Sequence, residues 1–235
     1  MKTHRLQRED LEKGVILLID KPAGWTSFDV VNKIRSVLRK RFGLKRLKVG
    51  HAGTLDPMAT GLLVVGIGPA TKKLHRLQSD DKTYEGRIRL GATTPSYDAD
   101  TPPDRFYPYE HVTEQTIRET AQKFLGESEQ LPPPYSAVKH KGKKLYEWAR
   151  KGETPPLKPR KVVIHRFDIT DIRLPDIDFV ADVGKGTYIR SLAHDFGKAL
   201  RSGAYLAALR RTRVGNFSVA DAVKLEDWVR DNTAP

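Results

Sequence analysis

One carboxylate stands out because of the residues around it. Asp56 lies in the stretch from Gly50 to Leu63, G-H-A-G-T-L-D-P-M-A-T-G-L-L, which holds three glycines, one proline and no other acidic residue. Gly and Pro at this density interrupt regular structure and set specific backbone angles, which predicts a stiff loop. A single Asp on such a loop can be a reactive group, or it can cap a turn, because Asp-Pro favours turns. The pattern alone leaves both interpretations open.

Two other stretches could contribute to a site. Tyr84 lies in the alternating segment 82–90 on the same face as Ile88 and Leu90, which is typical of a core aromatic unless Asp56 lies beside it. The segment from Gly184 to Leu192, G-K-G-T-Y-I-R-S-L, brings two glycines to the expected start of a helix, which suits an anion. It is not a Walker motif, so nucleotide binding is not expected.

Composition favours a polyanionic partner. The 235-residue chain has 42 Lys and Arg against 29 Asp and Glu, a formal net charge of +13, and clustered cations favour nucleic acid. There is no cysteine, and the seven histidines never form an HxxxH pair, so neither a disulfide nor a metal site is expected. The N-terminal residues lack the apolar core of a signal peptide, and no window is apolar enough to span a membrane. We therefore expect a cytoplasmic protein without membrane association.

The elements that must position these residues follow from hydrophobic periodicity. Apolar runs and alternation predict strands at 15–19, 61–67, 82–90, 161–172, 177–183 and 204–219. Helical spacing predicts helices from Thr26 or Ser27 to about Phe42, at 69–77, at 113–125, from about Tyr188 onward, and at 220–229. Strands interrupted by helices, without a repeat or a flexible linker, predict one mixed α/β domain of the α+β type.

Basic residues gather in two of these segments. The helix that ends near Phe42 and its tail carry a basic stretch at 35–48, and the segment 139–152 interleaves seven basic residues with Tyr146 and Trp148. Basic residues mixed with aromatics suit a surface that follows an RNA backbone and stacks on bases. The alternative is an ordinary surface helix whose Leu145, Trp148 and Ala149 pack inward.

Several stretches together resemble the TruB family of pseudouridine synthases. Besides the Asp56 loop they are D-K-P-A-G-W-T-S at 20–27, K-T-Y-E at 82–85, P-P-x-Y-S-A-V-K, G-T-Y-I-R-S-L at 186–192 and L-R-R-T-R-V-G at 209–215. The matches run in family order from about residue 14 to 217. The resemblance implies the pseudouridine synthase fold, a mixed and mostly antiparallel sheet flanked by helices and loops. It would form a single catalytic domain over 1–235, with its core at about 14–217 and a short tail at 218–235.

The resemblance also implies roles for individual residues. Asp56 matches the family's catalytic aspartate, Tyr84 the tyrosine that packs against the target base, and Arg190 the arginine that pairs with the aspartate. His51 matches the histidine that enters the RNA and fills the space left by the extruded nucleotide. The other substrate-binding positions fall on Lys21, Tyr188 and Leu209.

The implied reaction converts the T-loop uridine of tRNA, U55, to pseudouridine without a cofactor or a metal. The base must be flipped out of the RNA, at a cost of about a few kcal/mol, before its bond to C1′ moves from N1 to C5. Asp56 would act as nucleophile at C1′ or as base at C2′, and the sequence leaves this choice open. Arg190 would keep the carboxylate charged, and the Tyr84 hydroxyl would lie near C5.

Two other functions remain open. One is a guide-RNA-dependent pseudouridine synthase, and the other is a non-catalytic RNA-binding or chaperone protein on the same scaffold. Only eighteen residues follow Phe217, so no C-terminal PUA domain is expected, which argues against the first. The intact catalytic residues argue against the second. We expect a monomer that contacts the T-stem-loop of tRNA through the basic segments 35–48, 139–151 and 210–213, with 139–155 as a hinged clamp.

Overall fold

The structure is a computed structural model, and it describes residues 5–136, 138–149, 152–153 and 155–233. Its contacts divide the chain into two compact units. Unit 1 consists of Met1–Thr83 and Arg210–Pro235, and unit 2 consists of Tyr84–Leu209. Two strands, β4 (Lys82–Leu90) and β12 (Ala204–Val214), contribute residues to both units.

Unit 1 is built around two antiparallel strands, β1 (Val15–Lys21) and β3 (Thr60–Ile67), which pair from Val15↔Ile67 to Lys21↔Gly61. Three strands extend this pair. β2 (Val49–His51) pairs with β3 in antiparallel fashion, while β14 (Val223–Lys224) lies parallel to β1 and β12 lies parallel to β3. The remaining elements are α1 (Arg8–Lys13), α2 (Ser27–Phe42), a 3₁₀ turn (Gly68–Lys73), α3 (Leu74–Leu77), β13 (Phe217–Ser218), a second 3₁₀ turn (Val219–Asp221) and α7 (Leu225–Thr233).

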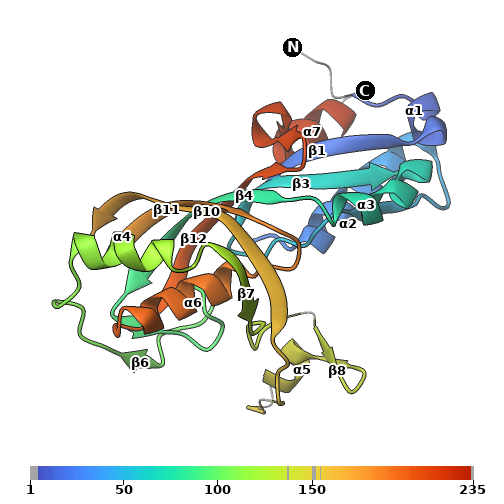
Figure 1. Cartoon of the computed structure of the whole chain (residues 1–235). Helices are drawn as coiled ribbons and strands as arrows, with labels where there is room; N and C mark the ends of the chain where they lie inside the picture. The colour runs from blue at the N-terminus through green and yellow to red at the C-terminus, as the bar shows by residue number, and fades with distance from the viewer. Residues whose placement is uncertain (1–4, 137, 150–151, 154, 234–235) are drawn as a thin grey trace. The chain divides into compact units, whose positions relative to one another are not determined.

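Both faces of β3 are buried, which explains its unbroken apolar sequence. Leu63, Val65 and Ile67 join one cluster, and Leu62 and Val64 join another. Helices α2 and α7 pack against each other in unit 1 and contribute Ile34, Leu38 and Trp228 to the first cluster. The tail thus contributes Val223, Leu225 and Trp228 to the core of unit 1, and Figure 1 shows α7 beside β1.

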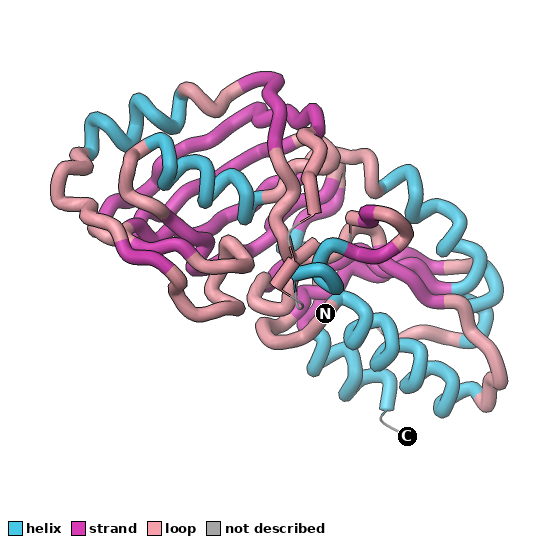
Figure 2. The backbone as a smooth tube through the Cα atoms, turned by 90° about the horizontal axis from the view of Figure 1, so that it is seen from below, coloured by secondary structure: helices cyan, strands magenta, loops and turns pink. Residues whose placement is uncertain are grey.

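Unit 2 is a sheet covered by helices. Its strand order is β12-β4-β11-β10-β7, in which β10 (Arg160–Arg173) and β11 (Asp176–Val183) form a long antiparallel hairpin and β7 (Gly126–Gln130) pairs with β10. Helices α4 (Glu114–Gln122) and α6 (Ile189–Ala199) lie on the same face of these strands, as Figure 2 shows. The remaining elements are β5 (Ala92–Thr93), β6 (Arg105–Phe106), β8 (Lys139–His140), β9 (Lys143–Lys144) and α5 (Leu145–Ala149).

Four phenylalanines hold the helices of unit 2 to its sheet. The Phe167 ring lies edge-to-face against Phe179 at 5.5 Å and against Phe196 at 5.3 Å between centroids. Phe124, which follows α4, meets Phe196 at 5.9 Å. Such edge-to-face pairs stabilise a core by about 0.5–1.5 kcal/mol beyond the area that they bury. The cluster keeps α6 in place, and α6 carries Arg190.

The observed architecture confirms the predicted fold class, a mixed and mostly antiparallel sheet flanked by helices. The helix predicted from Thr26 is also confirmed, with Thr26 as its N-cap and Asp29 closing a capping box. Two helix predictions are wrong in their bounds. Residues 68–73 form a 3₁₀ turn before the short α3, and the C-terminal helix begins only at Leu225 because 223–224 pair with β1 as a strand.

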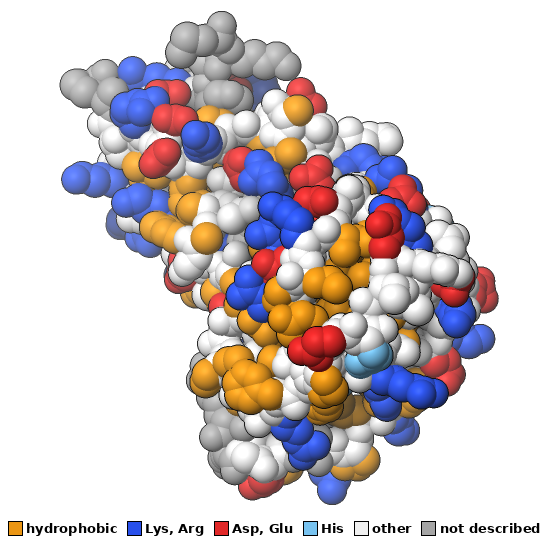
Figure 3. All heavy atoms as spheres, turned by 90° about the vertical axis from the view of Figure 1, so that its left-hand side faces the viewer, with side chains coloured by type: hydrophobic (Ala, Val, Ile, Leu, Met, Phe, Trp, Pro, Cys, Tyr) orange, Lys and Arg blue, Asp and Glu red, His pale blue; other side chains and the backbone are white. Residues whose placement is uncertain are grey.

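Part of the positive charge is paired with acidic side chains. Arg87 and Arg89 on β4 bind Asp178 and Asp176 on β11, with closest N–O distances of 2.6 and 2.7 Å. On the face seen in Figure 3, Lys and Arg side chains likewise lie beside Asp and Glu side chains. Neighbouring opposite charges weaken the field that reaches a distant polyanion.

Candidate active site

Asp56 of unit 1 lies on a loop that is fixed on both sides. The loop runs from the end of β2 to the start of β3, and the Asp56 side chain is half-buried. On one side, the buried Ser27 hydroxyl accepts from the Leu55 N–H at 2.8 Å and donates to the Leu55 carbonyl at 3.2 Å. On the other side, the Pro57 carbonyl accepts from the Gly24 N–H at 2.8 Å. The backbone before and after the carboxylate is therefore held by the turn that precedes α2.

Lys21 strengthens this attachment from inside the protein. Its side chain is fully buried, and its Nζ donates to the carbonyls of Pro22 at 2.9 Å, Trp25 at 2.6 Å and Pro57 at 3.3 Å. An ammonium group has three N–H donors, so three carbonyls can satisfy it even where water is excluded. Lys21, predicted from the resemblance as a substrate-binding residue, here joins the 22–25 turn to the residue after Asp56.

A third support comes from Arg211 on β12. The Arg211 side chain is 1% exposed, and it donates to the Leu62 carbonyl at 2.8 Å and to the Gly53 carbonyl at 3.0 Å. β12 can approach β3 this closely because the facing residue is Gly61, whose φ of +99° and missing Cβ leave room for the Arg211 backbone. Arg211 thus belongs to the interior.

The segment 210–213 is only partly the open basic surface that the sequence suggested, because Arg213 is exposed and Arg211 is buried. Besides the buried Arg211, Arg210 forms a bidentate pair with Asp20 at 3.0 and 2.6 Å. Arg213 donates to the Thr83 hydroxyl at 2.9 Å and to the Gly215 carbonyl at 3.0 Å. All three arginines thus donate hydrogen bonds within unit 1, and Arg213 does so from an exposed position.

His51 ends β2 beside a hollow of about 590 Å³ in unit 1. Arg35 and Lys48 also line this hollow, so it presents two cations near the imidazole. Burial, together with the nearby positive charge of Arg211, lowers the pKa of His51 below its usual value. Within the described part of the chain, its Nδ1 has no hydrogen-bond partner. A neutral imidazole ring in such a place suits stacking or space filling better than ion pairing.

In unit 2, Arg190 lies at the start of α6 and is 5% exposed. Its guanidinium donates to the carbonyls of Ser96 at 3.1 Å and Tyr135 at 2.9 Å. Its Nε lies 3.6 Å from a carboxylate oxygen of Asp98, which is also buried and accepts from the Ser96 hydroxyl at 2.5 Å. The planar guanidinium is thus held by three groups from the 96–98 loop and the 132–136 segment.

The other predicted residues of unit 2 lie in regular structure. Tyr84 on β4 and Leu209 on β12 are each 7% exposed. Tyr188 is the N-cap residue of α6; its N–H donates to the Gln130 side chain at 2.8 Å, and its carbonyl accepts from the same amide at 3.1 Å. The N-terminal end of α6 is therefore fixed to the end of β7.

The seven predicted residues divide between the units: Lys21, His51 and Asp56 belong to unit 1, and Tyr84, Tyr188, Arg190 and Leu209 belong to unit 2. The pairing of Asp56 with Arg190 stays a prediction. In the part of the chain that the structure describes, no group of three or more His, Asp and Glu residues could hold a metal ion, and no helix is long and apolar enough to cross a membrane.

Sequence reasoning misses three supporting residues. It predicts Ser27 only as a possible helix cap and gives Asp98 no role. It assigns Arg211 to a basic surface, although the position of Arg211 two residues after Leu209 on an alternating strand indicates an inward side chain. No sequence signal links Ser27 to Leu55 or Asp98 to Arg190, because these contacts depend on the fold.

The basic segment 139–152 lies partly outside the described residues. Where the structure describes it, β8 and β9 form a short hairpin that leads into α5, and Leu145 is buried. The Lys143 ammonium lies 5.6 Å from the Trp148 ring centroid, and that of Lys144 lies 5.4 Å from the Tyr146 ring centroid. The cations and aromatics thus pair with one another, and the hinged movement of 139–155 stays a hypothesis.

Comparisons with known proteins agree along nearly the whole chain. A model of the TruB family pseudouridylate synthase (N terminal domain) matches residues 39–189, and a model of the tRNA pseudouridylate synthase B C-terminal domain matches residues 190–232. A tRNA pseudouridine synthase B from Flavobacterium johnsoniae is 52% identical over 92% of this chain and 95% of its own length. One from Chloroherpeton thalassium is also 52% identical, over 91% of this chain and 88% of its own length.

Solved structures agree with the fold. A chain of a Cbf5-Nop10-Gar1 complex superposes with a TM-score of 0.73 at 31% identity, over 96% of this chain and 56% of that chain. A chain of an H/ACA RNP bound to a substrate RNA containing 2′-deoxyuridine gives a TM-score of 0.70 at 29% identity, over 96% of this chain and 55% of that one. This chain thus spans just over half the length of both. With the N-terminal family model covering more than half of its residues, the chain belongs to the TruB family of pseudouridylate synthases.

Proposed function

We propose that this chain is a tRNA pseudouridine synthase, an isomerase that converts U55 in the T-loop of tRNA to pseudouridine. The observation that carries this proposal is the 52% identity, over about nine-tenths of the chain, to relatives named tRNA pseudouridine synthase B. The structure supports it by presenting Asp56 half-buried on a loop whose neighbours on both sides are hydrogen-bonded. Pre-organised groups of this kind are what a catalytic carboxylate requires.

The reaction needs one carboxylate and a uracil base that can rotate in the pocket. Asp56 either attacks C1′ as a nucleophile or removes the proton from C2′, and in both cases the bond between N1 and C1′ breaks. The base then rotates and C5 bonds to C1′, as the bond between Asp56 and C1′ breaks in the first route or as C2′ regains its proton in the second. The proton on C5 then leaves, and N1, freed from C1′, takes up a proton. Atoms and electrons balance without an oxidant or a reductant, because substrate and product are isomers.

The other residues of the proposed site prepare this step. Arg190, whose guanidinium is fixed by the carbonyls of Ser96 and Tyr135, would pair with Asp56 and keep it ionised. Tyr84 would support the uracil ring and bring its hydroxyl near C5, where a proton must leave. A neutral His51 would fill the space that the flipped nucleotide vacates in the RNA and so offset part of the cost of flipping.

Three residues complete the assignment. Tyr188 and Leu209 would line the pocket around the target base. Lys21 would act as a positioning residue, since its ammonium binds the carbonyl next to Asp56. The partner is the T-stem-loop of tRNA, and the protein would bind it as a monomer.

A guide-RNA-dependent synthase is the second candidate, because the solved structures that superpose well are a Cbf5-Nop10-Gar1 complex and an H/ACA RNP. Their identity of 29–31% is well below the 52% of the relatives named tRNA pseudouridine synthase B. The two candidates make opposite predictions for the protein alone. A stand-alone enzyme modifies tRNA without any guide RNA.

The test is tritium release from unmodified tRNA labelled at C5 of uridine, with the purified protein alone. We expect release by the wild type, none by Asp56→Asn, and wild-type release by Asp168→Asn, a matched change on the exposed face of β10. An inactive wild type would overturn the stand-alone function. Activity that survives in Asp56→Asn would overturn the role of Asp56.

A further inference from the structure

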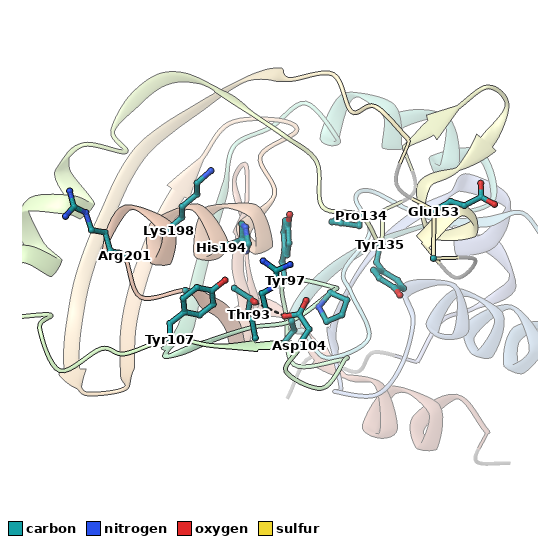
Figure 4. Close-up of a pocket in the computed structure, with 15 residues that line it drawn as sticks. Thr93, Tyr97, Asp104, Tyr107, Pro134, Tyr135, Glu153, His194, Lys198 and Arg201 are labelled. Atoms are coloured by element: carbon teal, nitrogen blue, oxygen red, sulfur yellow. Dashed lines mark hydrogen bonds between the residues drawn. The ribbon is translucent and has the colours of Figure 1, made fainter.

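Unit 2 contains a second hollow that the proposed reaction does not use. It measures about 830 Å³ and is lined by the 93–107 loop, the end of the 132–136 segment, and α6 with the turn that follows it. Its volume lies within the range of about 300–1,000 Å³ that is usual for ligand sites. Figure 4 shows Tyr97, Tyr107, Tyr135, His194, Lys198 and Arg201 around it.

An aromatic platform lies at the centre of this hollow. The rings of Tyr97 and His194 stack with centroids 3.8 Å apart and planes 8° from parallel, and both side chains are only half-buried. Tyr97 holds a backbone φ of +65°, fixed by its N–H bond to the Thr94 carbonyl and by the Leu206 N–H bond to its own carbonyl. Burial and the nearby Lys198 lower the pKa of His194, so its ring is neutral near pH 7. Flat neutral rings accept any base by stacking.

Two cations lie beyond the platform. Lys198 follows His194 by four residues and therefore shares its face of α6, and Arg201 lies in the turn after the helix. Both side chains are exposed, and neither forms a salt bridge with a carboxylate of the described residues. The hollow also carries two carboxylates. In Figure 4 Glu153 lies at the end opposite Arg201, and Asp104 lies near the platform, where it accepts from the Thr93 hydroxyl at 2.7 Å. The Lys198–Arg201 end thus suits a phosphate.

The hollow begins beside the groups that hold Arg190. Arg190 precedes His194 by four residues on the same face of α6, and it donates to the carbonyl of Ser96, the residue before Tyr97. It also donates to the carbonyl of Tyr135, which lines the hollow. A strand of RNA whose target base lies at Arg190 could therefore continue along this face of α6 within unit 2.

We propose that this hollow is a nucleotide subsite, which binds one unpaired nucleotide of the substrate RNA next to the target uridine. The base stacks on the Tyr97–His194 pair, and the phosphate lies at Lys198 and Arg201. This inference rests on the proposed function, because it takes the RNA as the substrate and Arg190 as part of the active site.

The first test measures binding of unmodified tRNA to the full-length Asp56→Asn protein, so that no turnover occurs, over a series of salt concentrations. Adding Lys198→Ala and Arg201→Ala should weaken binding and reduce the slope of log K against log salt by about 0.7 for each phosphate that the protein no longer neutralises. The control pair, Lys123→Ala and Lys161→Ala, removes the same charge from exposed positions of unit 2 outside the hollow. Equal slopes for the two double variants would overturn the subsite.

The second test addresses the base. His194→Phe keeps a flat ring and should retain affinity, whereas His194→Leu should bind about tenfold more weakly. In a T-stem-loop RNA, removing the base of one neighbour of the target uridine should weaken binding to the His194→Phe protein but not to His194→Leu. If removing the base weakens binding equally in the His194→Phe and His194→Leu proteins, at each of the two nucleotides next to the target uridine, the inference is wrong. Absence of tritium release by the wild type would instead overturn the proposed function, so the two failures are distinguishable.

Discussion

Replacing Ser27 by alanine should affect catalysis through the Asp56 loop. Ser27 is 1% exposed, and its hydroxyl exchanges two hydrogen bonds with the Leu55 backbone, at 2.8 and 3.2 Å. Leu55 is 3% exposed, so Ser27→Ala leaves a buried N–H and carbonyl without this partner. An unsatisfied buried group costs about 1–3 kcal/mol, and we expect the free energy of unfolding to fall by about 2–3 kcal/mol.

The decrease in activity should exceed what the decrease in stability explains. A displacement of about 1 Å in a catalytic group can reduce a rate about 100-fold, so kcat should fall about 10- to 100-fold with little change in KM. Thr26→Ala is the matched control, because Thr26 caps the same helix by accepting from the Asp29 N–H at 3.0 Å, away from Leu55. It should reduce stability by about 1 kcal/mol and keep its kcat.

Urea unfolding and steady-state rates of pseudouridine formation over a range of tRNA concentrations, both at a temperature where each variant is folded, provide the measurements. If Ser27→Ala and Thr26→Ala have the same kcat, the bonds to Leu55 do not position Asp56 for reaction. If Ser27→Ala raises KM and leaves kcat unchanged, the loop contributes to RNA binding alone.

Two further predictions concern the same unit. Burial and Arg211 lower the pKa of His51, so the unfolded chain takes up a proton first as pH falls below about 6.5, and stability decreases towards acid. His51→Gln should make the free energy of unfolding, measured by urea unfolding, fall less steeply between about pH 7 and 5. The difference should be less than about 1.4 kcal/mol per pH unit. If the free energy of unfolding of wild type and variant falls equally with pH, the lowered pKa of His51 is not the cause. Gly61→Ala should destabilise by more than about 1 kcal/mol, since a Cβ at φ +99° meets the Arg211 backbone. Gly142→Ala is the control, because Gly142 also has a positive φ, +82°, but no atom lies within 4 Å of the added Cβ. Equal urea midpoints for the two variants would show that the contact with the Arg211 backbone does not destabilise the protein.

The sequence predicts well what local chemistry decides. The Thr26 cap with Asp29 and the apolar face of α2 depend on neighbours within one or two turns, and both are confirmed. The unbroken apolar sequence of β3 predicts burial on both faces, because neither face can meet water. The stiff loop that carries Asp56 also follows directly from its glycines and proline.

Contacts that depend on the fold could not be predicted from the sequence. Residues 220–224 look helical beside Trp228, but Val223 pairs with Ile19 on β1, and this distant partner overrides local propensity. Asp98 is one acid among several in its loop until Arg190, 92 residues later, lies 3.6 Å away. The family resemblance could name Asp56 and Arg190, but it could not show which buried groups hold each of them.

The supports of the Asp56 loop come from widely separated parts of the chain. Ser27 is 28 residues from Leu55 and Lys21 is 36 residues from Pro57, whereas Arg211 is 158 residues from Gly53. Closing the longest of these loops costs about 1.5 kcal/mol more than closing the shortest, because the entropy cost grows with the logarithm of loop length. The Arg211 contacts can form only once β12 lies against β3, and the residues of unit 2 separate these two strands along the chain. The geometry around Asp56 therefore depends on residues from both ends of the chain, and a short segment that carries only the motif lacks the Lys21, Ser27 and Arg211 contacts that hold the loop.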